Sequence, residues 1–262
     1  MTYRFARERT DDSAYASGHV LHSAPGRTGF PVRLATEVFQ RCAALLGVRG
    51  VRPPFTLYDP CCGAGHLLTT IGLLHRESLG ELIGSDIDEA AVELARRNMA
   101  LLTPAGLTGR IAELDDRYRQ FGRASHAAAT DDARRMLARI GDLDDDDPLS
   151  VSAFTVDITQ PGAIAGRVSN GHVNMVITDV PYGNWSAWSS DASVPADHDP
   201  PEPPIARMLE TLRPVLAPDA VVAVVSGKDQ RASHPAFRRV ERWQIGRRRI
   251  EIVEIIPDGE GS

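Results

Sequence analysis

The sequence contains few cysteines, no long apolar segment and no secretory signal. Its three cysteines, Cys42, Cys61 and Cys62, fit neither a disulfide framework nor the spacing of a zinc site. The eight histidines show no metal-ligand spacing either, so no metal is expected. No run of about 18 apolar residues occurs, and the N-terminal segment lacks an apolar core. These absences predict a protein of the reducing cytoplasm that does not enter a membrane.

Lysine is also nearly absent, since Lys228 is the only lysine among 29 basic residues. The formal net charge of −6 excludes a uniformly basic protein, but the charges are unevenly distributed. Acidic residues concentrate at 142–147, 191–202 and 258–260, whereas arginines cluster at 4–9, 238–242 and 247–249. Because arginine suits phosphate recognition, a patchy basic face remains compatible with an RNA partner.

The order of apolar segments predicts an α/β fold. A chain of 262 residues with 42 % hydrophobic composition can form one domain over 1–262, with an N-terminal arm at 1–30 and a helical insertion at 103–150. We expect a mostly parallel sheet with antiparallel C-terminal strands and helices on both faces. The expected strands are 55–59, 81–86, 152–158, 172–178, 220–226, 238–244 and 248–256. The expected helices are 31–47, 66–77, 88–102 and 203–217, with one or two more helices over 114–143.

The segment TLYDPCCGAGH (56–66) predicts a nucleoside site. It reads as a strand, an acid and a glycine turn that opens a helix, and the next strand ends in Asp86, which can bind ribose hydroxyls. A dinucleotide fingerprint needs a third glycine, but Leu68 follows Gly63 and Gly65. Asp59 at the loop disfavours a pyrophosphate and suits a ligand with a cationic amino group. S-adenosylmethionine meets these requirements best.

Each of these residues also has a purely structural interpretation. Asp59 could cap the turn, and Gly63 and Gly65 could serve tight packing alone. Asp86 could be a helix N-cap, although Asp88 is the better candidate for that role. Asp157, expected at the end of the third strand, could contact an adenine amino group.

The run TDVPYGNW (178–185) predicts the acceptor site. Asp179 would end a buried strand, Pro181 would fix the turn that follows, and Tyr182 would offer a face for stacking on a base. A carboxylate only accepts hydrogen bonds, and the Watson–Crick edge of guanine offers two adjacent donors, so guanine is favoured over adenine. Trp185, in the irregular stretch that follows, either closes over an extruded base or packs under its loop.

These motifs carry a family resemblance. Asp59-Pro-Cys-Cys-Gly-Ala-Gly65 resembles the cofactor motif of Rossmann-type S-adenosylmethionine-dependent methyltransferases, and the likeness extends over about 30–256. Asp179-Val-Pro-Tyr182 resembles the Asp/Asn-Pro-Pro-Tyr motif of enzymes that methylate base nitrogens, with Val180 in place of the first proline. More narrowly, the sequence resembles the avilamycin-resistance rRNA methyltransferases of actinomycetes. The expected cofactor residues are Asp59, Cys61, Gly63, Ala64, Gly65, Asp86, Ile87 and Asp157.

The resemblance implies methylation of one guanine in 23S rRNA of the large ribosomal subunit, with N1 favoured over N2, and avilamycin-type resistance. Asp179, Pro181 and Tyr182 would form the catalytic group, and Trp185, Arg247 and Arg249 would contact the RNA. Because 247–249 lie on an expected strand, only alternate arginines can share one side. A small-molecule methyltransferase, a non-catalytic RNA-binding module and a DNA adenine methyltransferase remain alternatives.

Overall fold

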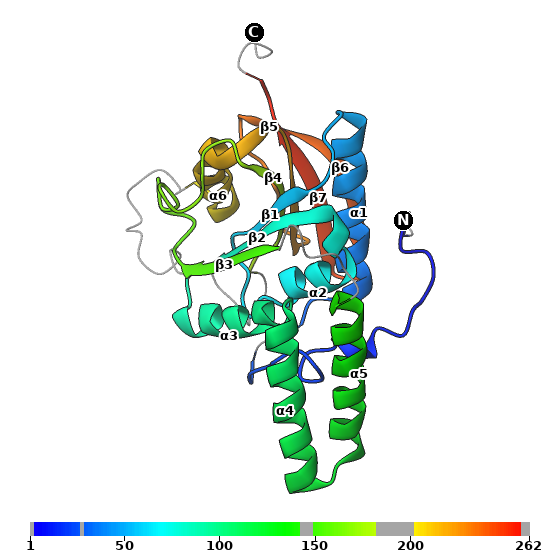
Figure 1. Ribbon diagram of the computed structural model, residues 1–262. Helices are drawn as coiled ribbons and strands as arrows, with labels where there is room; N and C mark the ends of the chain where they lie inside the picture. The colour runs from blue at the N-terminus through cyan, green and yellow to red at the C-terminus, as the bar shows by residue number, and fades with distance from the viewer. Residues whose placement is uncertain (1–2, 27–28, 142–148, 182–201, 258–262) are drawn as a thin grey trace.

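The computed structural model describes residues 3–26, 29–141, 149–181 and 202–257. Within these residues the chain forms a seven-stranded sheet with helices on both faces (Figure 1). The strands are β1 (Phe55–Asp59), β2 (Leu79–Asp86), β3 (Ser150–Thr155), β4 (Val173–Asp179), β5 (Leu216–Gly227), β6 (Phe237–Ile245) and β7 (Arg248–Ile255). The helices are α1 (Val32–Val48), α2 (His66–Leu74), α3 (Glu89–Ala100), α4 (Pro104–Phe121), α5 (Ala124–Gly141) and α6 (Pro204–Leu212), with short 3-10 turns η1 (Ser13–Tyr15), η2 (Arg76–Ser78) and η4 (Arg213–Val215).

The strand order is β3-β2-β1-β4-β5-β7-β6. The first five of these strands are parallel, and β7 runs antiparallel to both β5 and β6. The fold class expected from the sequence is therefore confirmed. Because β1 pairs with β2 on one side and β4 on the other, the chain switches direction across the sheet between them, where open α/β sheets bind ligands.

Alternation along the strands produces a separate core on each face of the sheet. Leu57, Met175 and Ile177 pack with α1, α2 and α3 on one face. Tyr58 and Val176, one residue out of phase, pack with α6 on the other face. Since successive side chains of a strand point to opposite faces, this assignment also fixes the face of each residue at the strand ends.

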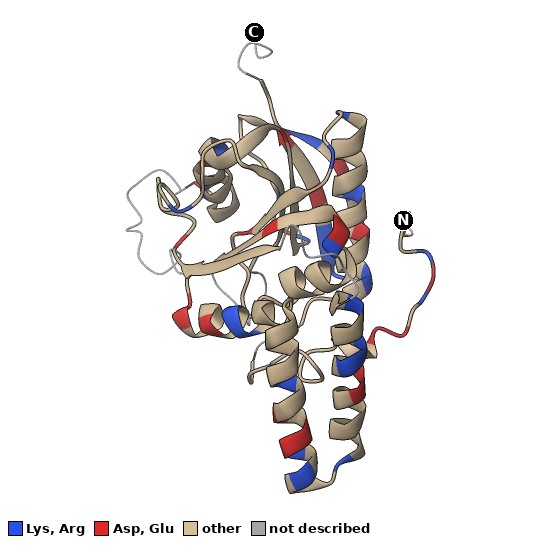
Figure 2. Ribbon diagram, in the orientation of Figure 1, with Lys and Arg blue, Asp and Glu red and all other residues tan. Residues whose placement is uncertain are grey.

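The insertion between α3 and β3 is an antiparallel pair of helices, α4 and α5, which projects from the rest of the molecule (Figure 1). It begins ten residues earlier than the expected helix at 114, because Thr103 caps α4 by accepting a hydrogen bond from the Gly106 N–H and Pro104 occupies the first turn. Basic and acidic positions are interspersed along both helices (Figure 2). No helix within the described residues is long and apolar enough to cross a membrane.

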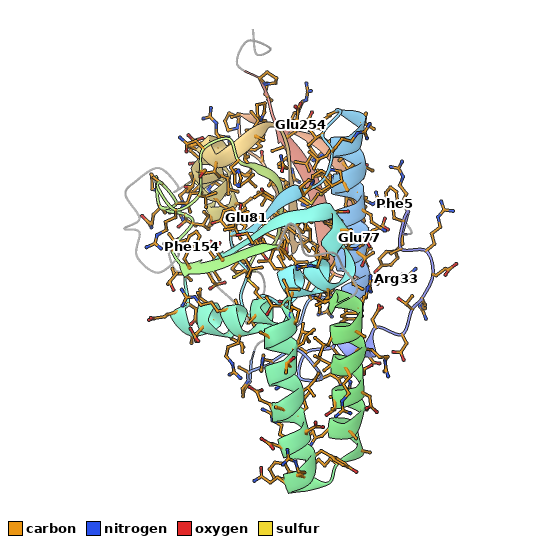
Figure 3. All side chains as sticks on the ribbon, viewed as in Figure 1. Phe5, Arg33, Glu77, Glu81, Phe154 and Glu254 are labelled. Carbon is orange, nitrogen blue, oxygen red and sulfur yellow. The ribbon has the colours of Figure 1, made fainter. Side chains whose placement is uncertain are left out.

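The N-terminal arm packs against α1. The buried carboxylate of Glu37 on α1 accepts hydrogen bonds from the backbone N–H groups of Arg4, Phe5 and Ala6. Arg33, also on α1, donates a hydrogen bond from Nε to the Ala6 carbonyl. Phe5 and Arg33 lie on the side of α1 along which the arm runs (Figure 3). The arm then continues toward the carboxyl edge of the sheet.

Several expected boundaries were wrong. The third strand ends at Thr155 rather than 158, so Asp157 lies in the following loop. The helix expected at 66–77 stops at Leu74, and that expected at 203–217 stops at Leu212 before η4. The fifth strand begins earlier, at Leu216. The acidic tract at 142–148 lies outside the described residues.

Candidate active site at the carboxyl edge of the sheet

Three acids occupy the carboxyl ends of neighbouring parallel strands: Asp59 on β1, Asp86 on β2 and Asp179 on β4. Within its strand, each acid follows a residue of the core on the α1, α2 and α3 side by an even number of positions. All three acids therefore lie on that same face of the sheet. Because β1 pairs with both β2 and β4, the three acids lie at adjacent strand ends, and the charges of Asp86 and Asp179 raise the pKa of Asp59. The three acids therefore converge at one edge of the sheet, and their roles toward a cofactor or a base stay predictions.

The glycine turn owes its shape to backbone conformations that favour glycine. Gly63 has φ of 51° and Gly65, the N-cap of α2, has φ of 72°. A Cβ on Gly65 would lie 3.0 Å from Cα of Ala95 on α3, so this glycine permits close helix packing. A Cβ on Gly63 would meet no atom within 4 Å. Gly63 therefore leaves backbone accessible beside open space, as a ligand needs.

Asp86 shapes the turn from the neighbouring strand. Its Oδ2 accepts a hydrogen bond of 2.9 Å from the Gly63 N–H, and its Oδ1 accepts one of 3.0 Å from the Asp88 N–H. Asp88, and not Asp86, is the N-cap of α3, because its carboxylate accepts from the N–H groups of Ala90 and Ala91. A carboxylate oxygen has a second lone pair, so Asp86 can still accept ribose hydroxyls.

Asp59 is 2 % exposed, and this burial raises the pKa of its carboxyl group to about 8. The Cys61 N–H donates to Asp59 Oδ1 at 3.1 Å and partly opposes the rise. Burial, together with Asp59 and Asp86, also raises the pKa of the Cys61 thiol well above its ordinary value. Cys61 is therefore a protonated packing residue of the turn and is unsuited to nucleophilic attack.

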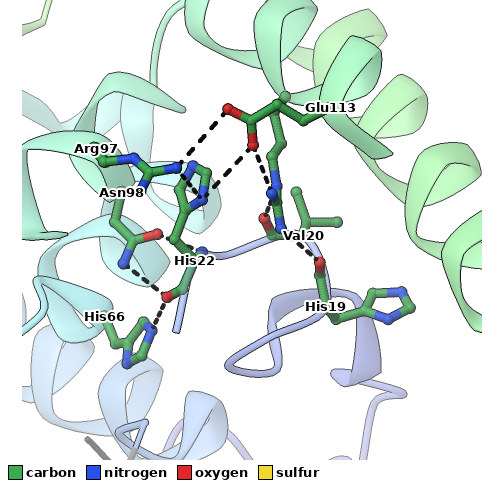
Figure 4. Close-up of polar contacts among 8 residues, drawn as sticks. His19, Val20, His22, His66, Arg97, Asn98 and Glu113 are labelled. Atoms are coloured by element: carbon green, nitrogen blue, oxygen red, sulfur yellow. Dashed lines mark hydrogen bonds and ion pairs between the residues drawn. The ribbon is translucent and has the colours of Figure 1, made fainter. Parts of the chain in front are cut away.

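The N-terminal arm reaches the cofactor turn through Asn98, a contact absent from the sequence-based expectations. The buried Asn98 side chain of α3 accepts from the His22 N–H at 2.7 Å and donates to the His22 carbonyl at 3.1 Å and to the Ala64 carbonyl at 2.8 Å. His66, the first residue of α2, contacts the same His22 carbonyl at 2.9 Å. Figure 4 shows the contacts of Asn98 and His66 with His22.

The helical insertion holds the same stretch of the arm from its other side. Arg110 on α4 is buried and donates hydrogen bonds to the carbonyls of Val20 and His19. Its Nη1 also donates a hydrogen bond of 2.8 Å to Glu113. Burial and nearby arginines lower the pKa of His22 to about 4, so this histidine is neutral and structural. The arm, the insertion and the cofactor turn thus form one connected network.

Asp157 makes local contacts that the sequence did not predict. Its carboxylate accepts hydrogen bonds from the Thr159 N–H, the Thr159 hydroxyl and the Gln160 side chain. Partial burial acts to raise the pKa of Asp157, but these hydrogen bonds outweigh it and the pKa is lowered. Asp157 therefore stabilises the loop after β3, and its contact with an adenine stays a prediction. Ile87, also predicted to bind cofactor, is half exposed beside Asp86.

Asp179 differs from the other acids because part of its carboxylate is unused. Its Oδ1 is buried without a hydrogen-bond partner among the described residues, and an unsatisfied buried acceptor costs about 1–3 kcal/mol. Burial raises the pKa of Asp179 to about 6, and the positive charge of Arg248 opposes that rise. At neutral pH this carboxylate is largely ionised and can accept a proton.

Gln230 fixes the turn after Asp179. Its side-chain Nε2 donates a hydrogen bond of 2.9 Å to the Pro181 carbonyl, so this carbonyl already has a partner. Arg249 Nη1 donates to the Gln230 carbonyl at 3.0 Å. Arg249 therefore supports the turn, whereas Arg247 is exposed. Tyr182 and Trp185 lie outside the described residues, and their contacts with a base remain predictions.

Arg248 is a second residue, after Asn98, that the sequence did not indicate as part of this edge. It is the first residue of β7 and aligns with Gly227 of β5, while Ile250 of β7 aligns with Val225, the partner of Asp179. Ile250 belongs to the core on the α1 face, so Arg248 is on the same face as Asp179. The alternation of side chains along β7 indicates that Arg248 and its two neighbours lie on opposite faces. To assign Arg248 to the face of Asp179, one must also know that β7 pairs with β5.

The residues at this edge fit S-adenosylmethionine. Asp86 can hold ribose hydroxyls, Asp59 can ionise beside a cationic amino group, and the open space at Gly63 admits a ligand against the backbone. The fold and these residues define a Rossmann-type S-adenosylmethionine-dependent methyltransferase.

Comparison with known proteins supports this assignment to a class of methyltransferases. The model of the rRNA methyltransferase AviRa family matches residues 1–248. A Streptomyces viridochromogenes protein named 23S rRNA (guanine(2535)-N(1))-methyltransferase is 42 % identical over 251 residues, covering 96 % of this chain and 95 % of that protein. Two crystal structures of the rRNA methyltransferase AviRa from the same organism are 41 % identical to this chain. One has a TM-score of 0.81 and covers 97 % of this chain and 96 % of that one, and the other has a TM-score of 0.79 and covers 96 % of each. The chain therefore belongs to the AviRa family of rRNA methyltransferases.

Proposed function

We propose that this protein transfers a methyl group from S-adenosylmethionine to N1 of one guanine in 23S rRNA. The observation that carries the proposal is Asp179, whose buried Oδ1 has no partner within the described residues and lies on the cofactor face of the sheet. The name of the Streptomyces viridochromogenes relative, which specifies guanine N1 in 23S rRNA, supports the same acceptor. Membership of an rRNA methyltransferase family supports the RNA substrate.

The mechanism follows from the chemistry of the two partners. S-adenosylmethionine supplies an activated methyl group, so the protein mainly has to position guanine N1 in line with it. Guanine N1 carries a proton that must leave before its lone pair can attack. Asp179 has a pKa of about 6, so it is ionised at neutral pH. Because this pKa lies near the operating pH, Asp179 can act as the general base. The Gln230–Pro181 hydrogen bond keeps the turn after Asp179 in place.

The RNA contacts are proposed from the sequence. Tyr182 would stack on the guanine and Trp185 would cover it once it is extruded from its stack, at a cost of about a few kcal/mol. The exposed Arg247 and the partly buried Arg249 would contact the phosphates. A Tyr182→Ala variant should lose activity on RNA while retaining cofactor affinity, and unchanged kinetics would count against stacking.

The alternatives make different predictions. A small-molecule methyltransferase would not need RNA, and its activity would not fall as salt displaces phosphate contacts. A non-catalytic RNA-binding module would bind rRNA without consuming the methyl donor. A DNA adenine methyltransferase would label DNA instead. The family relationship favours the rRNA enzyme over all three.

The direct test is to incubate the protein with a tritiated methyl donor and unmethylated 23S rRNA, and then to map the product by reverse transcription. A methyl group on N1 blocks pairing and halts extension, whereas one on the 2-amino group allows more read-through. A single strong stop at a guanine is expected. Label without a stop would overturn the N1 assignment, and no label on any rRNA would overturn the function.

We also propose that methylation of this guanine confers antibiotic resistance of the avilamycin type. Expression of the protein in a sensitive bacterium should raise the inhibitory concentration of avilamycin, and the Asp179→Ala variant should not. Resistance that persists in a variant without methyl transfer would separate protection from methylation.

A further inference from the structure

Two buried polar atoms without hydrogen-bond partners occur together at the acceptor end of the site. They are Oδ1 of Asp179 and Nε of Arg248, one an acceptor and the other a donor. The register β4-β5-β7 places Arg248 two residues beyond the position level with Asp179, on the same face. Although their charges interact, the two side chains form no direct ion pair in the part of the chain that the structure describes.

This pair matches the Watson–Crick edge of guanine in order and in polarity. Along that edge, guanine presents the acceptor O6 next to the donor N1–H. A carboxylate can only accept hydrogen bonds and a guanidinium can only donate them. A base placed between Asp179 and Arg248 would satisfy both buried atoms at once, provided that N1 faces the acid and O6 faces the arginine.

We propose that Arg248 is a catalytic residue whose guanidinium binds O6 of the target guanine and stabilises the negative charge that forms there as N1 loses its proton. This inference rests on the proposed function, since it concerns the same guanine. The N1–H proton moves to the Asp179 carboxylate. The N1 lone pair then forms the bond to the methyl carbon while the bond between that carbon and sulfur breaks. Sulfur keeps the bonding electrons and loses its positive charge.

Arg248 suits this role because the surrounding structure holds it in place. Its guanidinium carbon lies 5.8 Å from the ring centroid of Phe30, the last residue of the N-terminal arm, and Phe30 packs against the core on the α1 face. The negative charge shared between N1 and O6 would develop beside a partly buried cation, where electrostatic stabilisation is stronger than in water. The fixed arginine thus promotes loss of the N1 proton at neutral pH.

The same geometry gives discrimination between purines. Adenine carries an amino group where guanine has O6, and its N1 is an unprotonated acceptor. An adenine in this orientation would therefore place a donor against Arg248 and an acceptor against Asp179. Both contacts would be repulsive, so the pair selects guanine by two mismatches rather than one.

The test compares Arg248→Met, Arg248→Lys and the unmodified protein in single-turnover methylation of 23S rRNA. Arg248→Met should lower the rate at pH 7.5 about 100-fold or more, as for loss of an oxyanion donor. Its rate should keep rising with pH above 8, because hydroxide then assists loss of the N1 proton, whereas the parent should level off. Arg248→Lys should recover part of the rate, since it retains the charge. Cofactor affinity should stay within about twofold of the parent.

Arg52→Met is the matched control, because Arg52 is an exposed arginine that precedes β1 at the amino end of the sheet, opposite the carboxyl edge. It should keep the parental rate. A parental rate in Arg248→Met would show that the arginine only packs on Phe30. An equal loss of cofactor affinity and rate, with an unchanged pH profile, would also overturn the proposal. If the Met variant is unfolded in a thermal melt, Arg248→Lys and Arg248→Gln decide by the same rate and pH criteria.

The product of the unmodified protein separates this inference from the function on which it rests. If the parent makes no N1-methylguanine, the proposed function has failed. If the parent makes it and Arg248→Met makes it equally fast with the parental pH profile, only the role of Arg248 has failed.

Discussion

The two halves of the carboxyl edge use their polar groups differently. On the cofactor side, both oxygens of Asp86 accept backbone N–H groups, and Asn98 ties the carbonyl of Ala64 to the N-terminal arm. On the acceptor side, Oδ1 of Asp179 and Nε of Arg248 are buried without partners among the described residues. The cofactor turn is thus completed by the protein itself, whereas the acceptor side is incomplete without a ligand.

This difference has a physical consequence for binding. A turn held by its own hydrogen bonds is ordered before the methyl donor arrives, so binding should lose little conformational entropy there. Buried groups without partners are unfavourable in the free protein, and their unfavourable energy is relieved only by a ligand with matching donors and acceptors. Rigidity therefore belongs to the cofactor side and selectivity to the acceptor side.

The strongest test of the comparison is Asp179→Ala. Loss of the general base should lower methyl transfer by about 1,000-fold, within the range of acid–base catalysis. Cofactor affinity, measured by calorimetric titration, should change little, because the hydrogen bonds that hold the cofactor turn do not involve Asp179. The acid limb of the pH–rate profile of the parent should fall below about pH 6, the pKa of Asp179.

Two further variants sharpen this result. Asp179→Asn retains the shape and loses the charge, so it should also be inactive. Asp219→Ala, which removes an exposed acid at the start of β5, should behave as the parent. If Asp179→Ala loses cofactor affinity and activity to the same extent, the acid is structural and the two sides are not independent.

Asp86→Ala tests the cofactor side. It removes the acceptor of the Gly63 N–H together with the proposed ribose ligand, so affinity for S-adenosylmethionine should fall about 10- to 100-fold, as expected for hydrogen bonds to a charged group. Asp88→Ala is the control two residues away. It removes the α3 N-cap and should lower stability by about 1 kcal/mol with little change in cofactor affinity. Similar losses of affinity in both variants would mean that the turn responds only to general destabilisation.

The sequence was sufficient to predict the fold class and the three converging acids. Alternating strands and helices indicate a parallel sheet, and an acid at the end of each buried strand must lie at its carboxyl edge. Asp59, Asp86 and Asp179 depend only on this local pattern. Asp157 was placed wrongly because the strand ends at Thr155, and the Asx-type turn with Thr159 competes with strand extension.

Residues defined by long-range contacts could not be predicted in this way. Asn98 acts through His22, which lies 76 positions away in the chain. Arg248 becomes part of the site only because β7 enters the sheet antiparallel beside β5, which fixes its face. The sequence indicated that successive arginines of 247–249 would point to opposite faces of the sheet. It did not indicate which of them would face Asp179.

The ionisation of Asp59 gives a pH test of the cofactor side. Its pKa of about 8 means that it is mostly protonated at pH 6–7 in the free protein. A cationic amino group favours the ionised form, so binding should release a proton and affinity should rise with pH, by at most about tenfold per unit, up to about pH 8. Calorimetry in buffers of different ionisation enthalpy would measure the proton. No proton release at pH 7 would contradict the assigned contact.

The same raised pKa has an opposite effect on stability. A buried acid with a raised pKa contributes most at low pH, and that contribution is lost as pH rises from its ordinary value near 4 through about 8. The asparagine of Asp59→Asn cannot ionise, so this variant does not lose that contribution. Its melting temperature should therefore rise relative to that of the parent as the pH increases from 6 to 8. Its cofactor affinity should no longer depend on pH in that range. A constant difference in melting temperature would contradict burial as the cause.

The last test compares two glycines of the cofactor turn. Replacement by alanine should cost about 1–2 kcal/mol at either position, because both have a left-handed φ. Only Gly65→Ala also brings a Cβ to 3.0 Å from Ala95, which adds about 1–3 kcal/mol of overpacking. Thermal melts should therefore rank Gly65→Ala as the less stable. Gly63→Ala should instead lose cofactor affinity, because its new methyl group occupies the open space beside the turn. Equal stability and equal affinity in the two variants would mean that the turn shifts freely, contrary to a cofactor side that is rigid before the ligand arrives.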